Sequence, residues 1–275
     1  LDENNELSAG QVNWMREDIE QSDADWIIVQ MHKSIYSKGS HVGDDDVCAL
    51  RNQLSELFTE LDIDLVLSGH DHVYMRTQPV SYYGAGNHET VTITRDGIEY
   101  EAYADTDGTM FVSSATSGVK KYNPAELSET AEYFPNYYYD FPIEEGGDLK
   151  NAMFSAITVD GTTLTFTAYT YDDNGALYIC DKTALTKTKI EFMSGDADVD
   201  GTFTPADART ALRLAVGLDW KTVSDLTLLA ADFNGDGNIG VDDARRILRC
   251  SVGLSDLELV EIRKIFKGEL DSRYE

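Results

Sequence analysis

The stretch that decides the fold is LVLSGHDHVYMRT, residues 65–77. A short apolar run ends in a glycine, and two histidines, His70 and His72, follow with one residue between them. A short apolar run bounded by turn residues is typical of a β-strand. Packing alone gives no reason for two imidazoles at its end, so the stretch indicates an ion-binding site at a strand terminus.

The residues before this stretch alternate between helical and strand patterns. Ser8 and Gln11 form a capping box, and an apolar stripe follows, so a helix is expected over residues 8–21. A buried strand is expected at Trp26–Met31, a second helix over 47–61, and a second strand that ends near Ser68. The order helix, strand, helix, strand predicts an α/β layer with parallel strands.

Regular structure is harder to assign in residues 81–150, which are rich in Tyr, Gly and acidic residues. This segment is expected to be irregular, with one short strand at MFVSSA, residues 110–115. Residues 154–173 show two alternating runs around Asp160-Gly161, a pattern that predicts a β-hairpin.

Three of the five histidines in the chain fall at the ends of these expected strands. His32 follows the strand that ends at Met31, and His70 and His72 follow the next one. Functional residues of open α/β sheets lie just beyond the carboxyl ends of the strands, and neutral imidazole is a ligand for Zn, Fe or Mn. The alternative is that these are loop histidines that form ordinary hydrogen bonds.

Four segments carry a resemblance to a known family: VQMHKSIYS (29–37), DLVLSGHDHVYMRTQPV (64–80), MFVSSATSGVKKYN (110–123) and FSAITVDGTTLTFTAYTYD (154–172). They resemble the second half of a calcineurin-like metallophosphoesterase of the purple acid phosphatase branch. The resemblance implies an α/β fold for residues 1–188, namely the C-terminal half of a four-layer αββα sandwich.

The same resemblance implies a phosphate ester substrate and two transition-metal ions, each Fe, Zn or Mn. His32 and His70 would hold one ion and His72 the other. His41 falls where the family often keeps a histidine that contacts the phosphate or protonates the leaving group. The alternative for His41 is a plain loop histidine.

The remaining ligand blocks of the family, DxG, GDxxY and GNHE, precede the first of these histidines, and residues 1–31 contain none of them. A GNHE at residues 86–89 comes after the histidine motif, outside the family order. The sequence therefore looks like the C-terminal part of an enzyme, and we expect it to be inactive by itself.

A duplication marks a second domain, expected at residues 195–275. Residues 196–218 align without gaps to residues 232–254, and eight of the last twelve positions are identical. Oxygen-bearing side chains at positions 1, 3, 5 and 12, with glycine at 6, match the ligand spacing of a calcium loop. The expected ligands of two Ca²⁺ ions, including backbone carbonyls at position 7, are Asp196, Asp198, Asp200, Thr202, Thr204, Asp207, Asp232, Asn234, Asp236, Asn238 and Asp243.

Each loop ends in Asp rather than in the Glu of an EF-hand, and a single helix follows it. Two such loop–helix units resemble a dockerin, a small all-α module that binds the cohesin domain of a scaffoldin. In dockerins the helices contact the partner, and the alternative is that these are ordinary solvated helix faces. The corresponding candidates are Arg209, Arg213, Arg245, Arg246 and Arg249.

The net charge of −28 argues against nucleic acid as a partner, because like charges repel. No apolar window is long enough for a membrane span. The dockerin resemblance implies a secreted or cell-surface protein of a bacterium or archaeon. The hypothesis is therefore a secreted phosphoesterase that is tethered to a scaffold. The alternative is a tethered binding component whose phosphatase-like domain is inactive.

Overall fold

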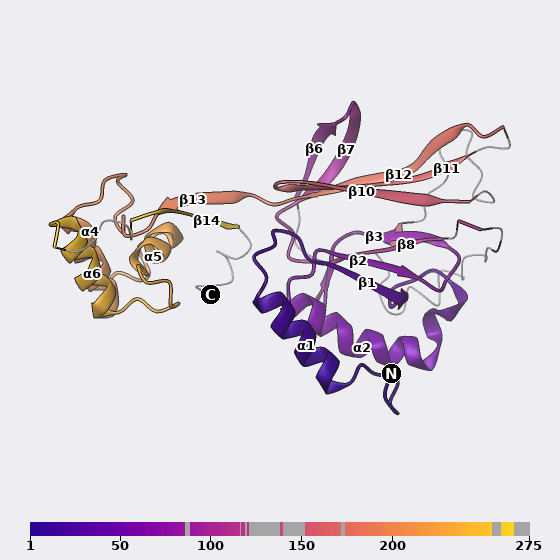
Figure 1. The fold of residues 1–275 in the computed structure, drawn as a ribbon, viewed down its shortest axis with the longest axis horizontal. Coiled ribbons are helices and arrows are strands. Elements are labelled where there is room, and N and C mark those ends of the chain that lie inside the picture. Colours follow the sequence, from indigo (N-terminus) through magenta and orange to yellow (C-terminus); the bar gives the residue numbers. More distant parts are fainter. Residues whose placement is uncertain are drawn as a thin grey trace. The chain divides into compact units, whose positions relative to one another are not determined.

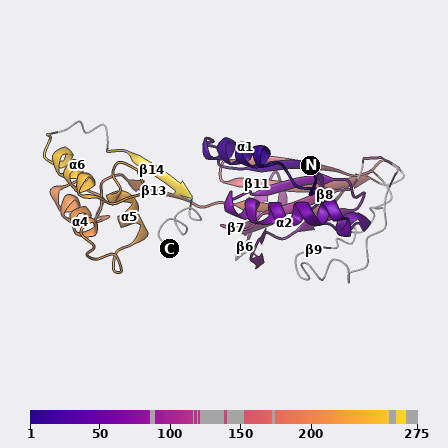
Figure 2. The ribbon, with the colours of Figure 1, turned by 90° about the horizontal axis from the view of Figure 1, so that it is seen from below.

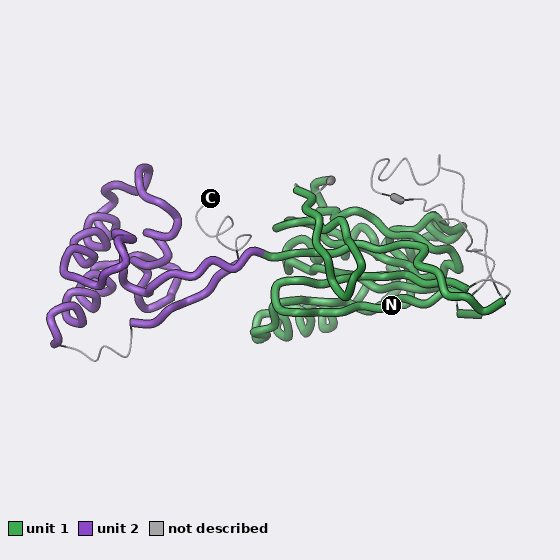
Figure 3. Tube along the Cα trace, turned by 90° about the horizontal axis from the view of Figure 1, so that it is seen from above, with its two compact units in different colours: residues 1–187 green, residues 188–275 purple. Residues whose placement is uncertain are grey.

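The protein is described by a computed structural model, and the chain forms two compact units, residues 1–187 and 188–275 (Figure 3). The structure describes residues 1–85, 89–115, 117–118, 120, 138–139, 152–171, 174–254 and 260–266.

The first unit contains a five-stranded sheet with two helices on one face (Figure 1). Its strands, in spatial order, are β1 (Ile28–Lys33), β2 (Leu65–Gly69), β8 (Met110–Ser114), β3 (Tyr74–Thr77) and β9 (Tyr138–Tyr139). β1, β2 and β8 are parallel, and β3 runs antiparallel to β8 and β9. The helices are α1 (Ala9–Glu20) and α2 (Asp45–Glu60), which lie below the sheet in Figure 1 and in front of it in Figure 2.

A second five-stranded sheet covers the other face of the first (Figure 1). Its strands, in spatial order, are β10 (Phe154–Asp160), β11 (Thr163–Tyr171), β12 (Leu177–Thr186), β7 (Ile98–Ala104) and β6 (Glu89–Arg95). A short hairpin, β4 (Val80–Ser81) with β5 (Gly84–Ala85), and the 3₁₀ helix η1 (Ser40–Gly43) complete the unit. The layers helix, sheet, sheet agree with the expected metallophosphoesterase fold.

The apolar run of β2 packs against apolar residues on both of its faces. Leu65 packs in the core between the two sheets, whereas Val66 packs against the helices. The neighbouring strand β8 divides in the same way, with Met110 and Val112 in the first core and Phe111 in the second. Both faces of β2 and β8 contact apolar layers, and for this reason their residues form continuous apolar runs in the sequence.

A buried polar cluster joins the two sheets. Arg76 on β3 donates from Nε to Oδ2 of Asp181 on β12 at 2.7 Å, and the Tyr74 hydroxyl donates to the same oxygen at 2.6 Å. The side chains of the ion pair are only 5% and 3% exposed. The Tyr and Arg of the histidine motif therefore hold β3 against the second sheet.

Replacement of Asp181 by alanine leaves the Arg76 guanidinium buried without its counterion. Loss of one partner of a buried ion pair costs about 3–5 kcal/mol, so urea denaturation should show a drop of this size in the unfolding free energy of the first unit. The matched control is Asp160→Ala, because Asp160 pairs with Arg95 at the surface and exposed pairs contribute at most about 1 kcal/mol. Equal effects of the two substitutions would contradict this account.

Two of the strand expectations for this unit were wrong. The first strand is β1 (Ile28–Lys33), whose residues are exposed or half-buried rather than buried, and His32 lies within it rather than after it. Residues 89–104 are a hairpin of β6 and β7 and not irregular. The signal was present, because Asp96 and Gly97 join two alternating runs and both have positive φ (50° and 77°), as a type I′ turn requires.

The second unit is built around the duplicated helices α4 (Pro205–Ala215) and α6 (Val241–Ser251), with α5 (Asp225–Ala231) between them. Small and medium apolar side chains at equivalent positions of the two repeats form its core, which includes Ala208, Ala211, Leu214, Ala244, Ile247 and Cys250. Their size lets the two helices pack closely. None of the helices in the described part of the chain has the length and apolar character that a bilayer crossing requires.

The expectation of an all-α domain over residues 195–275 was wrong for one segment, residues 262–266, which form a strand. β13 (Lys189–Met193) pairs antiparallel with β14 (Ile262–Phe266), with Ile190 opposite Ile265. These side chains pack with Leu229 of α5, so the strand pair forms a small core of its own. Short strands that lie so far apart in sequence give no local hairpin signal, which is why the pattern did not reveal them.

Candidate metal centre

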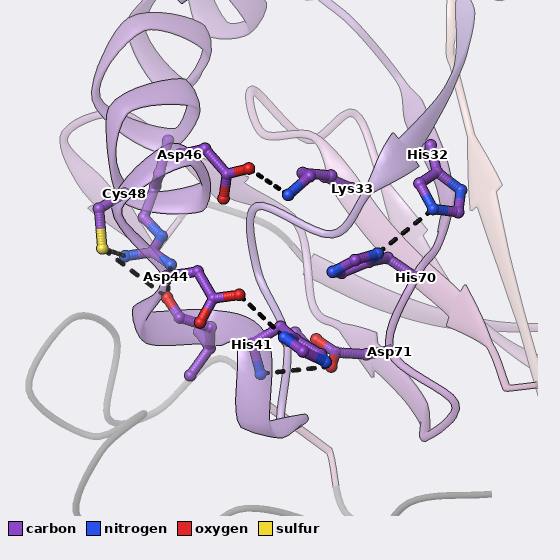
Figure 4. Close-up of polar contacts among 11 residues, drawn as sticks. His32, Lys33, His41, Asp44, Asp46, Cys48, His70 and Asp71 are labelled. Carbon is purple, nitrogen blue, oxygen red and sulfur yellow. Dashed lines mark hydrogen bonds and ion pairs between the residues drawn. The ribbon is translucent and has the colours of Figure 1, made fainter. Parts of the chain in front are cut away.

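His32 and His70 meet at the carboxyl edge of the parallel strands. Lys33 of β1 lies in register with Gly69 of β2, which brings the ends of the two strands side by side. His70 Nδ1 lies 3.2 Å from His32 Nε2 (Figure 4). His70 has a φ of 68°, a left-handed conformation that is uncommon for a residue other than glycine and that occurs at functional turns.

His72 is held by a different contact. Its Nδ1 lies 2.8 Å from the carbonyl oxygen of Lys120. A carbonyl oxygen only accepts, so this contact places the proton on Nδ1 and the lone pair on Nε2, as in many histidines that bind a metal.

His41 lies on the opposite side of His70 from His32 (Figure 4). The ring centroids of His41 and His70 are 4.6 Å apart, and His41 Nδ1 lies 2.8 Å from Oδ2 of Asp44. Asp44, the residue before α2, was not among the residues singled out in the sequence. The sequence could have indicated this contact, because Asp44 follows His41 by three residues and the turn of η1 lies between them.

Asp71, the middle residue of the motif, joins the two loops that carry the histidines. Its side chain is buried, and its carboxylate accepts from Ser37 Oγ at 2.5 Å and from the backbone N–H of His41 at 3.4 Å. A Cβ atom on Gly39 would clash with the Asp71 side chain. The close approach at Gly39 therefore permits this bridge, which fixes His41 relative to His70.

The local electrostatics favour neutral imidazole at His70. Burial lowers the pKa of His70, and the nearby Lys33 ammonium lowers it further. Lys33 forms an ion pair with Asp46 at the start of α2, which lowers the pKa of that carboxyl (Figure 4). Since only the neutral ring can bind a metal ion, these shifts keep His70 in the ligand form.

The donor set fits one part of the expected dinuclear centre. His32 and His70 present nitrogens close enough to bind one ion, and the tautomer of His72 leaves Nε2 as its ligand atom. Among the described residues, the groups whose ligand atoms all lie within 4.8 Å of one another are His41–Asp44–His70 and Asp196–Asp198–Asp207. Gly86–His88 of the GNHE stretch lie outside the described residues.

A cavity of about 530 Å³ opens beside His32. Three hydroxyl groups line it, on Ser68, Ser114 and Ser155, and those of Ser114 and Ser155 lie 2.9 Å apart. It lies at the carboxyl ends of β1 and β2, the place where ligands bind in open α/β sheets.

The two acidic loops of the second unit have the same internal geometry. Asp207 accepts from the backbone N–H groups of Asp198 and Thr204, at 3.2 and 2.7 Å. In the second loop Asp243 accepts from Asn234 and Gly240 at 3.1 and 2.8 Å.

The first residues of the two loops also accept equivalent hydrogen bonds. Asp196 accepts from the backbone N–H of Gly201, and Asp232 accepts from that of Gly237. The expected position-1 and position-12 carboxylates are thus placed alike in both repeats.

Burial raises the pKa of Asp198, and the neighbouring carboxylates of Asp207 and Asp200 raise it further. Burial likewise raises the pKa of Asp243. Crowded carboxylates of this kind gain from a cation that offsets their repulsion. The five candidate partner-binding arginines all lie on exposed parts of α4 and α6: Arg209, Arg213, Arg245, Arg246 and Arg249.

The imidazoles of His32 and His70 thus lie at the carboxyl edge of the parallel strands, where functional residues of open α/β sheets are found. The family model of the calcineurin-like phosphoesterases matches residues 1–74. Residues 1–74 are therefore similar to part of a calcineurin-like phosphoesterase domain.

Three proteins illustrate the similarity. Purple acid phosphatase 21 of Arabidopsis thaliana is 30% identical over 79 residues, which is 27% of this chain and 18% of that protein. An uncharacterized protein of Mycobacterium tuberculosis is 29% identical over 100 residues, which is 36% of this chain and 18% of that protein. The purple acid phosphatase PPD1 of yellow lupin superposes with a TM-score of 0.49 and 17% identity, over 66% of this chain and 29% of that chain. The chain thus spans about a fifth of the length of the curated relatives it matches.

Proposed function

We propose that the first unit is the carboxyl-terminal portion of a two-metal phosphoesterase that hydrolyses phosphate esters. The observation that carries this proposal is the meeting of His32 and His70 at 3.2 Å, with His41 against the other side of His70. His32 and His70 hold one ion and His72 the other, each ion being Fe, Zn or Mn. Carboxylate and asparagine ligands come from sequence outside residues 1–275.

Two divalent or trivalent ions in such a centre supply Lewis-acid polarisation of the phosphate and lower the pKa of the attacking water. The chain's own residues do the rest. His32, His70 and His72 are fixed in place by β1, β2 and the contact to Lys120. The cavity beside His32 accommodates the ester group, and its serine hydroxyls can hydrogen-bond the substrate.

His41 is the proton donor to the leaving alkoxide in this proposal. A proton shared with Asp44 through Nδ1 leaves Nε2 as the atom that faces substrate. Asp44 stabilises the protonated imidazole and fixes its orientation, as a carboxylate does for a catalytic histidine. Asp71 acts one step further away, because it holds the His41 loop against the His70 loop.

The test is hydrolysis of a chromogenic phosphate ester by the chain of residues 1–275 and by a chain extended upstream in its own reading frame. The extended chain should turn over the ester, and residues 1–275 alone should not, because two ions need a bridging carboxylate to stay together against their repulsion. If the extended chain has all acidic ligand blocks and is inactive, the enzyme proposal is wrong.

For the second unit we propose a dockerin-like role, in which two Ca²⁺ ions order the duplicated loops and the helices bind a cohesin domain. The matching hydrogen-bond pattern of the two loops and their crowded carboxylates support calcium. A module of this kind serves exported proteins, so we place the protein outside the cell of a bacterium or archaeon, as a secreted or surface-attached component.

The partner surface proposed on α4 and α6 is tested by capture of the cohesins of the source organism with calcium present. Binding at micromolar concentration should weaken when Arg209 and Arg245, which occupy equivalent positions of the two repeats, are both changed to Ala. Failure of every cohesin to bind would rule out this partner.

The second candidate function is a scaffold-attached binding protein whose phosphatase-like domain has lost its catalysis. The upstream reading frame separates the two: intact acidic ligand blocks support the enzyme, and their absence supports the binding protein.

A further inference from the structure

His70 has a second group of potential ligands on the side away from His32. One ligand atom each of His41, Asp44 and His70 lies within 4.8 Å of the other two. Figure 4 shows His70 between His32 on one side and the His41–Asp44 pair on the other. All of these residues belong to the first unit.

The arrangement is anchored by the surrounding fold. Asp44 directly precedes α2, and His41 lies in η1, whose backbone is tied to the buried carboxylate of Asp71. The pair His41–Asp44 is therefore a fixed donor pair beside His70, although its side chains are 35% and 45% exposed and so open to an ion from solution.

We propose that residues 1–275 bind a single transition-metal ion through His41, Asp44 and His70, at a site distinct from the His32–His70 pair of the dinuclear centre. This inference rests on the proposed function only in sharing His70. Two imidazoles and one carboxylate are a donor set that suits Zn²⁺ or Co²⁺.

Binding replaces a proton. His41 Nδ1 and Asp44 Oδ2 lie 2.8 Å apart and share one hydrogen. When the ion binds Nδ1, the single proton of a neutral His41 moves to Nε2, whereas a protonated His41 releases its Nδ1 proton to solvent. The Asp44 carboxylate then faces the ion directly.

Such an ion has a functional consequence. It occupies the His41–Asp44 pair, the proposed proton donor, and takes a nitrogen of His70. Occupation of this site by excess metal would therefore inhibit the extended enzyme, and the inhibition would be competitive with formation of the dinuclear centre rather than with substrate.

The experiment titrates Co²⁺ into residues 1–275 with Ca²⁺ in large excess, so that the acidic loops of the second unit are already filled with a cation that imidazole does not bind. The visible absorption of nitrogen-bound Co²⁺ is the readout, and Zn²⁺ is added afterwards as a competitor. We expect one Co²⁺ per chain, displaced by Zn²⁺.

His41→Ala and Asp44→Asn should each weaken the affinity at least about tenfold, whereas His32→Ala and His72→Ala should leave it within about twofold. Far-UV circular dichroism confirms that each variant is folded, and Asp44→Glu, which keeps the carboxylate, should retain much of the binding.

Loss of binding in His32→Ala with normal binding in His41→Ala would place the ion between His32 and His70 and would overturn the proposal. Equal binding by all variants would show that the ion lies elsewhere and would overturn it as well. Neither result bears on the phosphatase assay of the extended chain, so failure of this site and failure of the proposed function are distinguishable.

Discussion

Removal of calcium from the chain is expected to unfold the second unit while the first unit stays folded. Each loop places a buried position-1 and a buried position-12 aspartate around one point, and burial with like charge raises the pKa of Asp198. Without a cation the carboxylates repel one another at short range, and the small core of the unit has little apolar area to offset this. An ion at a hundred times its dissociation constant adds about 2.7 kcal/mol of stability.

Hydrogen exchange measured by mass spectrometry resolves the two units within the same chain. Excess EGTA should abolish protection in α4 and α6 and leave β2 and β8 protected. Asp200→Ala and Asp236→Ala should each raise the calcium needed for protection, and the control Asp219→Ala, an exposed acid outside the loops, should not. Unchanged protection in EGTA, or equal rescue by Mg²⁺, which prefers a stricter octahedral site, would show that the loops do not bind calcium.

Substitution of His70 by alanine in the upstream-extended chain is expected to abolish hydrolysis of a phosphate ester. His70 lies between His32 and His41, so its loss removes a ligand and opens the contact between the metal centre and the proton donor. Changes even to residues that only support a metal ligand cost about 10–100-fold, and loss of a ligand should cost at least the upper end of that range in kcat/KM.

The measurement compares kcat and KM together with bound metal by elemental analysis. The His70→Ala chain should hold fewer transition ions and show a lower kcat. Arg16→Ala serves as the control, since Arg16 pairs with Glu60 on the exposed surface of α1 and α2 and should leave both quantities unchanged. Full activity in His70→Ala would mean that the proposed ligand set is wrong.

Local pattern was sufficient for much of the first unit. The cap by Ser8 is confirmed, because its side chain accepts from the backbone N–H of Gln11 at 3.3 Å. The strand β2 could also be predicted from its apolar run, because a strand that is covered on both faces has apolar residues on both. The hairpin of β6 and β7 was missed although Asp96-Gly97 is a strong turn signal between two alternating runs, of which β6 is exposed along most of its length.

The sequence by itself revealed the histidine motif and the duplicated acidic loops as candidate metal sites, since metal binding requires particular residue types at particular intervals. Only the tertiary structure revealed that Asp44 pairs with His41, that Asp71 ties the two histidine loops together and that Asp181 holds Arg76. The last of these contacts joins residues 105 positions apart, and a single carboxylate carries no periodicity that could indicate its partner. The pairing of β13 with β14 likewise joins segments that meet only after the repeats have folded. Main-chain hydrogen bonds do not depend on side-chain identity, so the sequence does not indicate which strand is the partner.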